Sequence, residues 1–297
     1  MNTFLPRKID KVLVPPIKCQ GIKTKLINFI AANIRWDGAG RWIEPFLGSG
    51  VVLFNIRPER ALVSDTNKHI IRFYQEIQSG IIDEIIVRDY LQEHGVRLFE
   101  KGKDYYYEMR YNFNQSQDDS LLFLFLNRAS FNGLMRFNSK GEFNVPFNHK
   151  PERFRKGYIT KIANQIGNIR KIIIDHDWKF EVADWEETIS LSNDKDFVYL
   201  DPPYIGRHTD YFNSWKEEDA LKLAIKTKAL PAGFALSMWK ENKYRQNEHL
   251  KNAWDGLVMK EFKHFYHVGP TESLRNHMTE VLAIKPEYAV KTELMAS

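Results

Sequence analysis

Short apolar runs alternate along the chain with longer amphipathic stretches, and the two patterns predict different elements. Runs rich in β-branched and aromatic residues at 41–46, 61–65 and 197–200 predict buried strands. Apolar residues three or four positions apart predict helices across most of residues 67–127. Strands that alternate with helices in this way are typical of an α/β protein with a mostly parallel sheet.

The C-terminal part of the chain continues this alternation and then departs from it. Residues 179–183 and 233–238 predict further strands, with a helix at 217–227 before the second of them. Residues 261–268 and 279–284 predict two strands joined by a long hairpin loop, so these two run antiparallel. We therefore expect a parallel sheet that ends in an antiparallel hairpin strand.

The segment Asp201-Pro202-Pro203-Tyr204 directly follows one predicted strand. Asp201 is thereby placed at the carboxyl end of a strand, where open α/β sheets bind their ligands. Its carboxylate and the Pro202 carbonyl are two acceptors for the two N–H bonds of a planar exocyclic amine, and Tyr204 offers a flat face for a base. An ordinary strand end with a proline turn and a solvated aspartate contains the same residues, so other segments must decide.

A glycine turn and an acid predict a nucleoside site on the same edge of the sheet. Gly48 and Gly50 lie between a strand and a helix, where a ligand can approach backbone N–H groups. Asp65 ends the next strand, as an acid that binds ribose hydroxyls does. The spacing is short and a third glycine is missing, which argues against NAD and for a smaller nucleoside cofactor.

Two further segments are candidates for this edge. Lys18 and Lys23 flank a glycine turn before a predicted helix, where lysines can bind a carboxylate or a phosphate. Asp184 and Trp185 follow the strand at 179–183, and the tryptophan could lie against an adenine ring. Solvated lysines and an ordinary packed tryptophan are the simpler interpretations.

Positive charge is concentrated in one part of the chain. Residues 128–171 contain ten Lys or Arg and two Glu, while the whole chain has a formal net charge of +5. Within residues 127–156, basic side chains alternate with phenylalanines, and residues 138–141 predict a hairpin turn. This combination suits nucleic acid, with charges for phosphates and rings for stacking, although a solvated basic hairpin is the alternative.

Composition excludes several classes of site. Cys19 is the single cysteine, which rules out an intrachain disulfide and any cysteine-cluster metal site, and we expect no metal. The longest apolar run, at 121–126, is far shorter than the ~20 residues that span a bilayer. The first residues lack the apolar core of a signal peptide, so a cytoplasmic protein without a membrane partner is expected.

The spacing of these features predicts an inserted domain. Roughly 150 residues separate the glycine turn from Asp201, far more than two intervening strands of a doubly wound sheet require. We expect residues 1–68 and 157–297 to form a catalytic, cofactor-binding domain. Residues 69–156 are expected to form a mainly helical target-recognition domain with a β-hairpin.

Taken in order, these segments resemble the Dam-type DNA adenine-N6 methyltransferases, the alpha or D12 class. The resemblance covers almost the whole chain, and its most specific part is the stretch from Phe131 to Pro146. It rests on Lys18-x-x-Gly21-x-Lys23, Glu44-Pro45-Phe46-x-Gly48-x-Gly50, Asp65, Phe131-Asn132-Gly133-x-x-Arg136-x-Asn138, Gly141-x-Phe143-Asn144-Val145-Pro146 and Asp201-Pro202-Pro203-Tyr204.

The resemblance implies a Rossmann-like sheet, S-adenosyl-L-methionine as methyl donor and double-stranded DNA as substrate. It implies that Lys23 holds the methionine end of the cofactor and that Asp65 holds its ribose. The expected catalytic residues are Asp201, Pro202, Pro203 and Tyr204. The expected cofactor-binding residues are Cys19, Lys23, Glu44, Phe46, Gly48, Gly50, Asp65, Asp184, Trp185 and Asp201. The expected DNA-binding residues are Lys18, Phe131, Asn132, Arg136 and Asn138.

Two positions differ from the usual pattern of the family. Cys19 stands where an aromatic residue is common, and it is still expected to line the cofactor pocket. Phe131 stands where many members have the tyrosine that wedges into the duplex, and a phenylalanine can stack but not hydrogen-bond.

The same resemblance implies base flipping and a target with a G-A-T core. Segments 14–26, 205–215 and 264–269 carry a wider likeness to one member, which implies the six-base site GATATC with its first adenine methylated. A monomer of a type II restriction-modification system would then act on each strand in turn, and residues 205–215 would close over the flipped base. Methylation of cytosine N4 or of an RNA base, and a non-catalytic DNA-binding relative, are the alternatives.

Overall fold

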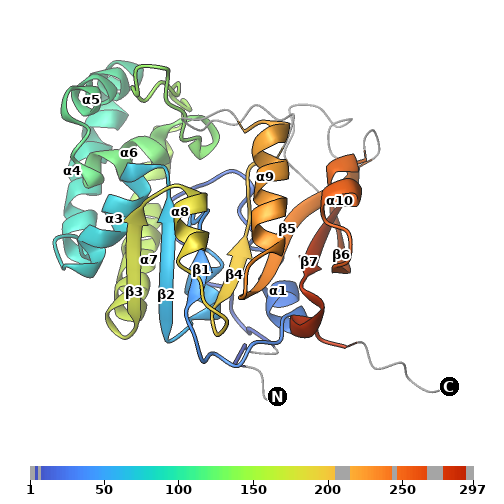
Figure 1. Cartoon of the computed structure of the whole chain (residues 1–297). Helices are drawn as coiled ribbons and strands as arrows, with labels where there is room; N and C mark the ends of the chain where they lie inside the picture. Colours follow the sequence, from blue (N-terminus) through green and yellow to red (C-terminus); the bar gives the residue numbers. More distant parts are fainter. Residues whose placement is uncertain (1–3, 6–7, 205–214, 243–245, 266–276, 292–297) are drawn as a thin grey trace.

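The computed structural model describes residues 4–5, 8–204, 215–242, 246–265 and 277–291. These residues contain a seven-stranded sheet in the order β3-β2-β1-β4-β5-β7-β6, with helices on both faces (Figure 1). Strands β1 to β5 are parallel, and β7 runs antiparallel to both β5 and β6, as predicted. The strands are β1 (Trp42–Glu44), β2 (Arg60–Asp65), β3 (Asp177–Val182), β4 (Phe197–Leu200), β5 (Gly233–Asn242), β6 (Val258–Phe265) and β7 (His277–Ile284). The expected Rossmann-like sheet with a terminal antiparallel strand is confirmed.

Alternate residues of the central strands point into two separate apolar cores, one on each face of the sheet. Trp42 and Phe197 belong to the first core, whereas their neighbours Ile43 and Val198 belong to the second. The first core is covered by α1 (Ile27–Asn33), α2 (Leu53–Ile56), α3 (Lys68–Gln78) and α7 (Lys156–Ile174). The second is covered by α8 (Trp185–Ser190), α9 (Glu217–Lys228) and α10 (Glu248–Ala253). Burial on both faces explains why these strands are apolar without a break.

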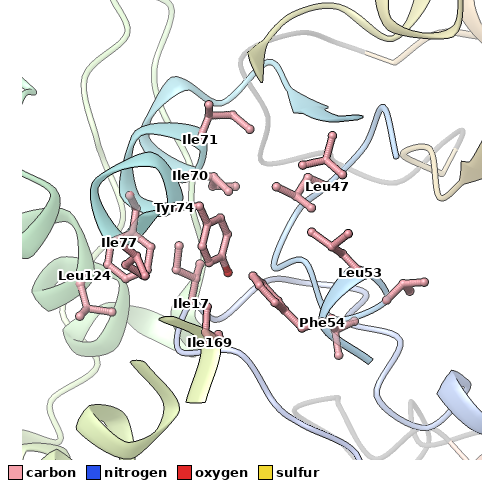
Figure 2. Packing of buried hydrophobic residues seen from close by; sticks show 14 of the residues in the cluster. Ile17, Leu47, Leu53, Phe54, Ile70, Ile71, Tyr74, Ile77, Leu124 and Ile169 are labelled. Carbon is pink, nitrogen blue, oxygen red and sulfur yellow. The ribbon is translucent and has the colours of Figure 1, made fainter. Parts of the chain in front are cut away.

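The first core fixes the glycine turn that follows β1. Figure 2 shows Tyr74 of α3 among apolar side chains from several elements, including Phe54 of α2 and Ile17 of the N-terminal segment. The Tyr74 hydroxyl donates a hydrogen bond of 2.7 Å to the carbonyl of Ser49. Gly50 has a φ of +71°, and a Cβ there would lie 2.7 Å from the Phe54 ring. The packing of this core therefore requires glycine at the second position of the turn.

A helical region extends beyond the β3 edge of the sheet (Figure 1). It contains α4 (Glu84–Lys101), α5 (Lys103–Ser116) and α6 (Ser120–Ala129), followed by the short helices η1 (Phe131–Gly133) and η2 (Pro151–Phe154). The predicted hairpin turn is confirmed, because Phe137 and Phe143 form an antiparallel bridge across it. Helix α3, which precedes this region, packs on the sheet rather than away from it.

Three features complete the description. A last short helix, η4 (Pro286–Tyr288), follows β7. In the part of the chain that the structure describes, no helix is long and apolar enough to cross a membrane. Residues 205–214 and 266–276, which include most of the predicted closing segment and the predicted hairpin loop, lie outside the described residues.

Candidate active site

A cavity of about 380 Å³ lies at the carboxyl ends of β1 to β4. An acid that lines the cavity ends each of these strands or follows it. In the order β3, β2, β1 and β4 across the sheet, these acids are Asp184, Asp65, Glu44 and Asp201. The helices after β1 and β4 cover opposite faces, so the cavity lies at the switch point of the sheet, where such folds bind ligands.

Lys23 joins the N-terminal segment to the tetrad that follows β4. Its Nζ lies 2.8 Å from Oδ1 of Asp201 and donates hydrogen bonds of 3.1 Å to the Tyr204 hydroxyl and to the Gly21 carbonyl. Oε2 of Glu280, on β7, lies 3.9 Å from the same nitrogen. The three N–H bonds of the ammonium thus have protein acceptors. Among the described residues, Asp201 is held through Oδ1 and shows no hydrogen-bond partner at Oδ2.

Burial makes the charges of this group interdependent. The side chains of Lys23 and Glu280 are 4 % and 7 % exposed, and that of Asp201 is 24 % exposed. Burial alone would lower the pKa of Lys23, but Asp201, Tyr204 and Glu280 together raise it well above its ordinary value. Burial raises the pKa of Asp201, and the positive charge of Lys23 opposes that shift. A charged ammonium therefore supports the carboxylate at the rim of the cavity.

Glu44 is a second buried acid in the same cavity. Its Oε1 accepts a hydrogen bond of 2.6 Å from the indole nitrogen of Trp42. Burial raises the pKa of Glu44 to about 8, with the Trp42 bond opposing this shift and the charge of Asp201 adding to it. A cationic ligand in the cavity would favour the ionised form of Glu44.

Asp65 closes the glycine turn through its side chain. Its Oδ2 accepts the backbone N–H of Gly48 at 2.9 Å, and its Oδ1 accepts that of Asn67 at 2.8 Å. Burial raises the pKa of Asp65, and these two hydrogen bonds oppose the shift. Asp65 lines the cavity, and each of its carboxylate oxygens can accept a further hydrogen bond, as a site for two hydroxyl groups requires.

Three aromatic side chains surround the far end of the cavity beside Asp184. Trp215 lies edge-on to Phe46 at 5.7 Å and to Trp185 at 6.4 Å between ring centroids. Asp184 caps α8 by accepting the backbone N–H of Glu186 at 2.9 Å. This end of the cavity offers flat apolar faces with a carboxylate beside them, which suits a purine.

The structure brings together all but one of the expected cofactor-binding residues. Those that line the cavity are Cys19, Lys23, Glu44, Phe46, Gly48, Asp65, Asp184, Trp185 and Asp201, with Pro202, Pro203 and Tyr204 of the tetrad. Gly50 does not line the cavity. Glycine is needed at this position because a Cβ would collide with the Phe54 ring.

The expected DNA-binding residues lie outside the cavity, on the helical side of the molecule. Phe131 is 50 % exposed at the start of η1, and Asn132 is exposed with a left-handed φ of 53°. Arg136 is exposed, and its Nε donates to Oδ1 of Asn144 at 2.8 Å. These three side chains are presented by one turn and one hairpin.

Asn138 has an internal role in the hairpin. Its Oδ1 accepts the backbone N–H groups of Lys140 and Glu142, and its Nδ2 donates to the Glu142 carboxylate at 2.7 Å. The amide is thereby used to shape the turn, and contact of Asn138 with DNA stays a prediction.

Lys18 lies beside the Phe131–Gly133 turn in a cluster of positive charge. Its backbone N–H and carbonyl both bond to the side-chain amide of Asn127. Burial, then the charges of Arg128 and Arg153, lower the pKa of Lys18 to about 8. Within the described part of the chain, none of these three cations pairs with a carboxylate. An anion such as a phosphate would relieve their mutual repulsion.

Comparison with known protein families identifies the family of this chain. Residues 20–268 match the model of the D12 class N6 adenine-specific DNA methyltransferases. The chain belongs to this family. A type II methyltransferase, M.MjaIII of Methanocaldococcus jannaschii, is 30 % identical over 233 residues, which cover 71 % of this chain and 78 % of the relative.

Two further relatives agree with this assignment. The type II methyltransferase M1.LlaDCHI of Lactococcus lactis subsp. cremoris is 29 % identical over 228 residues, covering 73 % of this chain and 75 % of the relative. The DNA adenine methylase of Escherichia coli (strain K12) is 32 % identical over 169 residues, covering 54 % of this chain and 55 % of that protein.

As a D12 methyltransferase, the chain uses S-adenosylmethionine as methyl donor. The cavity fits that molecule by the chemistry of its walls. Asp65 can accept the two ribose hydroxyls, and Phe46 with Trp185 can hold the adenine. Glu44 and Asp201 place negative charge in the same cavity, which suits a sulfonium cation.

Trp215 is the last residue of the segment 205–215 that was expected to close over the base, and it lines the cavity. Two residues of the site were not expected from the sequence. Tyr199 lines the cavity from within β4, and its hydroxyl bonds to Ser237 at 2.7 Å. Glu280 had a usable signal, because a charged residue inside the apolar strand 279–284 must find a buried partner.

Cys19 allows cofactor binding to be tested without measuring methyl transfer. It is the only cysteine of the chain and lines the cavity next to Gly48. Alkylation by N-ethylmaleimide should therefore slow when the cofactor is bound, by about 100-fold at a concentration near 100 Kd. Mass spectrometry of timed samples gives the rate, and an unchanged rate under saturating cofactor would place Cys19 outside the cofactor pocket.

Proposed function

We propose that this methyltransferase modifies N6 of an adenine that is flipped out of duplex DNA into the Asp201–Tyr204 end of the cavity. The observation that carries the proposal is the asymmetric support of Asp201. Lys23 holds Oδ1 at 2.8 Å, whereas Oδ2 has no hydrogen-bond partner among the described residues, and Asp201 lines a cavity that fits the methyl donor. This is the arrangement that a weakly nucleophilic amine needs next to an electrophilic methyl group.

The roles of the tetrad follow from its acceptors. Bound S-adenosylmethionine supplies an electrophilic methyl carbon on a sulfonium. Asp201 Oδ2 and the Pro202 carbonyl each accept one N6 hydrogen, which turns the nitrogen lone pair out of the plane of the base. Asp201 is then placed to accept the proton that N6 loses, while Lys23 keeps its carboxylate ionised before that step. Tyr204 supports the base from its flat side.

Lys23 has a different role in this scheme from the one that the resemblance implies. Its ammonium already has three acceptors, so we assign it to the orientation of Asp201 and Tyr204. A contact of Lys23 with the methionine end of the cofactor stays a prediction, as do the other cofactor contacts.

We further propose that residues 69–156 form the target-recognition unit and that residues 1–68 and 157–297 form the catalytic unit. Phe131 would stack in the space of the flipped base, and Asn132 and Arg136 would contact base edges. Lys18, with the neighbouring Arg128 and Arg153, would bind the phosphate backbone.

The proposed target is GATATC, with the first adenine methylated. It rests on the resemblance to the EcoRV modification methylase in segments 14–26, 205–215 and 264–269, of which residues 14–26, 215 and 264–265 are described. The type II names of two relatives support a role in restriction-modification. A cytoplasmic monomer that methylates each strand in turn completes the proposal.

Arg136 provides the sharpest test of the target. A bidentate arginine is worth ~1–3 kcal/mol of discrimination for guanine, so Arg136→Ala should lower the preference for the guanine before the adenine by roughly 5- to 150-fold. Lys140→Ala, at an exposed position of the same hairpin, should instead weaken binding to all sequences alike and flatten its salt dependence.

Methylation rates on duplexes with GATATC, with GATC and with each single substitution measure the discrimination, and binding titrations at several salt concentrations measure the effect of Lys140→Ala. Methylation at GATC alone would retain the family assignment and reject GATATC. A set of preferred duplexes without any G-A-T core would reject the proposed use of Arg136.

A further inference from the structure

Helix α5 presents a row of polar side chains to the hairpin of residues 136–145, here called the recognition hairpin. The row consists of Tyr106, Arg110 and Asn114, which are spaced by four residues and so share one face of the helix, and of Gln117, the residue that caps the C-terminal end of α5. None of the four side chains lines the cavity, so the family assignment gives them no role in cofactor binding or methyl transfer.

Each of the four side chains reaches the backbone of residues 141–145. Gln117 Nε2 donates to the Gly141 carbonyl at 2.7 Å. Asn114 binds Phe143 twice, donating to its carbonyl at 3.1 Å and accepting its N–H at 2.8 Å.

The remaining two side chains bind the next carbonyl along the same edge. The Tyr106 hydroxyl and Arg110 Nη1 donate to the Val145 carbonyl at 2.8 and 3.2 Å. The bonded residues alternate along the chain, as the residues on one edge of a β-strand do.

The intervening residues use the opposite edge of the same segment. Asn138 N–H donates to the Glu142 carbonyl at 2.9 Å, and Asn144 N–H donates to the Arg136 carbonyl at 3.0 Å. Residues 141–145 therefore bond to the backbone of residues 136–138 on one side and to the side chains of α5 and Gln117 on the other. A two-stranded hairpin is marginal in water, and α5 supplies the third partner that such a hairpin lacks.

The hairpin in turn fixes Arg136. Phe137 and Phe143 point into the core, so the alternate residues Arg136 and Asn144 point outward. Oδ1 of Asn144 accepts Nε of Arg136 at 2.8 Å, and its carbonyl accepts Nη2 at 3.4 Å. The plane of the guanidinium is thereby set by a residue whose two neighbours, 143 and 145, are both bound by α5.

We propose that this face of α5 is a splint that takes the place of a missing strand and positions Arg136 for base recognition, with Asn114 as its central positioning residue. The proposal rests on the proposed role of Arg136 in reading the target. Asn114 is the central residue of the splint because it bonds to both the N–H and the carbonyl of Phe143, as a neighbouring strand would.

The splint can be tested first in the free protein. Asn114→Ala should speed hydrogen exchange of the Phe143 amide by about ten-fold or more, because that N–H loses its only acceptor in the described structure. Asn112→Ala is the matched control, since Asn112 is an exposed asparagine on the same helix. Equal protection of Phe143 in wild type and in Asn114→Ala would overturn the splint.

The consequence for recognition needs a second measurement. We expect Asn114→Ala to lower guanine discrimination by about three- to ten-fold, with cofactor affinity within two-fold of wild type, and Asn112→Ala to change neither. In an Arg136→Ala background the effect of Asn114→Ala on discrimination should vanish, because Asn114 acts through Arg136.

The outcomes separate the two claims. If Arg136→Ala relaxes discrimination but Asn114→Ala does not, the splint is wrong and the role of Arg136 remains. If Asn114→Ala lowers discrimination equally in both backgrounds, Asn114 does not act through Arg136 and the proposal is also wrong. If Arg136→Ala itself leaves discrimination unchanged, the proposed role of Arg136 in reading the target fails, and only the exchange result speaks for the splint.

Discussion

Asp201→Ala is expected to abolish methyl transfer while leaving the fold intact. The change removes the acceptor at N6 and the group that accepts its proton, and positioned acid-base groups are each worth roughly 10²–10⁴ in rate. The fold should survive because Lys23 retains hydrogen bonds to Tyr204 and Gly21 and the nearby carboxylate of Glu280. Transfer of labelled methyl groups to DNA measures the rate, and urea unfolding measures stability.

Asp194→Ala is the matched control for this variant. Asp194 is an exposed aspartate at the opposite end of β4, so its removal should leave methyl transfer within two-fold of wild type. If Asp201→Ala turned over as fast as Asp194→Ala, the proposed catalytic site would be wrong.

The second large effect is expected from Lys23→Met. The ammonium of Lys23 opposes the rise in the pKa of Asp201 that burial causes, so its loss should raise that pKa further. Activity needs the ionised carboxylate, which is lost as the pH falls through this pKa. The variant should therefore lose activity at a higher pH than wild type does, and regain part of it at alkaline pH. The pH profile of kcat checks this.

Lys23→Met also has a stability cost with a clear cause. It leaves Asp201 and Glu280 in a buried site without their cation, and removing one partner of a buried pair costs roughly 3–5 kcal/mol. Lys11→Met, at an exposed position of the same N-terminal segment, should change neither stability nor the pH profile. A Lys23→Met profile that coincides with that of wild type would show that Lys23 does not tune Asp201.

The edge of the sheet that holds the site could be predicted from the sequence. The end of a strand can be recognised from the local sequence, because an apolar run that stops at an acid or at a proline shows it without any knowledge of tertiary contacts. This logic placed Asp65, Asp184 and Asp201 on one edge of the sheet, the family resemblance added Glu44, and all four line the cavity. The same local patterns gave the antiparallel end of the sheet and the turn at 138–141.

Contacts across the chain were beyond sequence reasoning. Lys23 meets Asp201 although the two residues are 178 positions apart in the chain, and the family resemblance had assigned that lysine to the cofactor. Glu280 reaches the site only because β7 packs beside β5. Asn138 fits a base-reading pattern, yet its amide is used within the turn. Such assignments depend on tertiary geometry that no local spacing encodes.

The product of the reaction tests the central claim most directly. Wild-type protein is incubated with S-adenosylmethionine and unmethylated duplex DNA, and the DNA is then digested to nucleosides and analysed by mass spectrometry. The account predicts N6-methyladenine as the methylated nucleoside, absent when Asp201→Ala replaces the wild type. N4-methylcytosine, methylation of RNA but not of DNA, or no product from protein that binds the cofactor would contradict it.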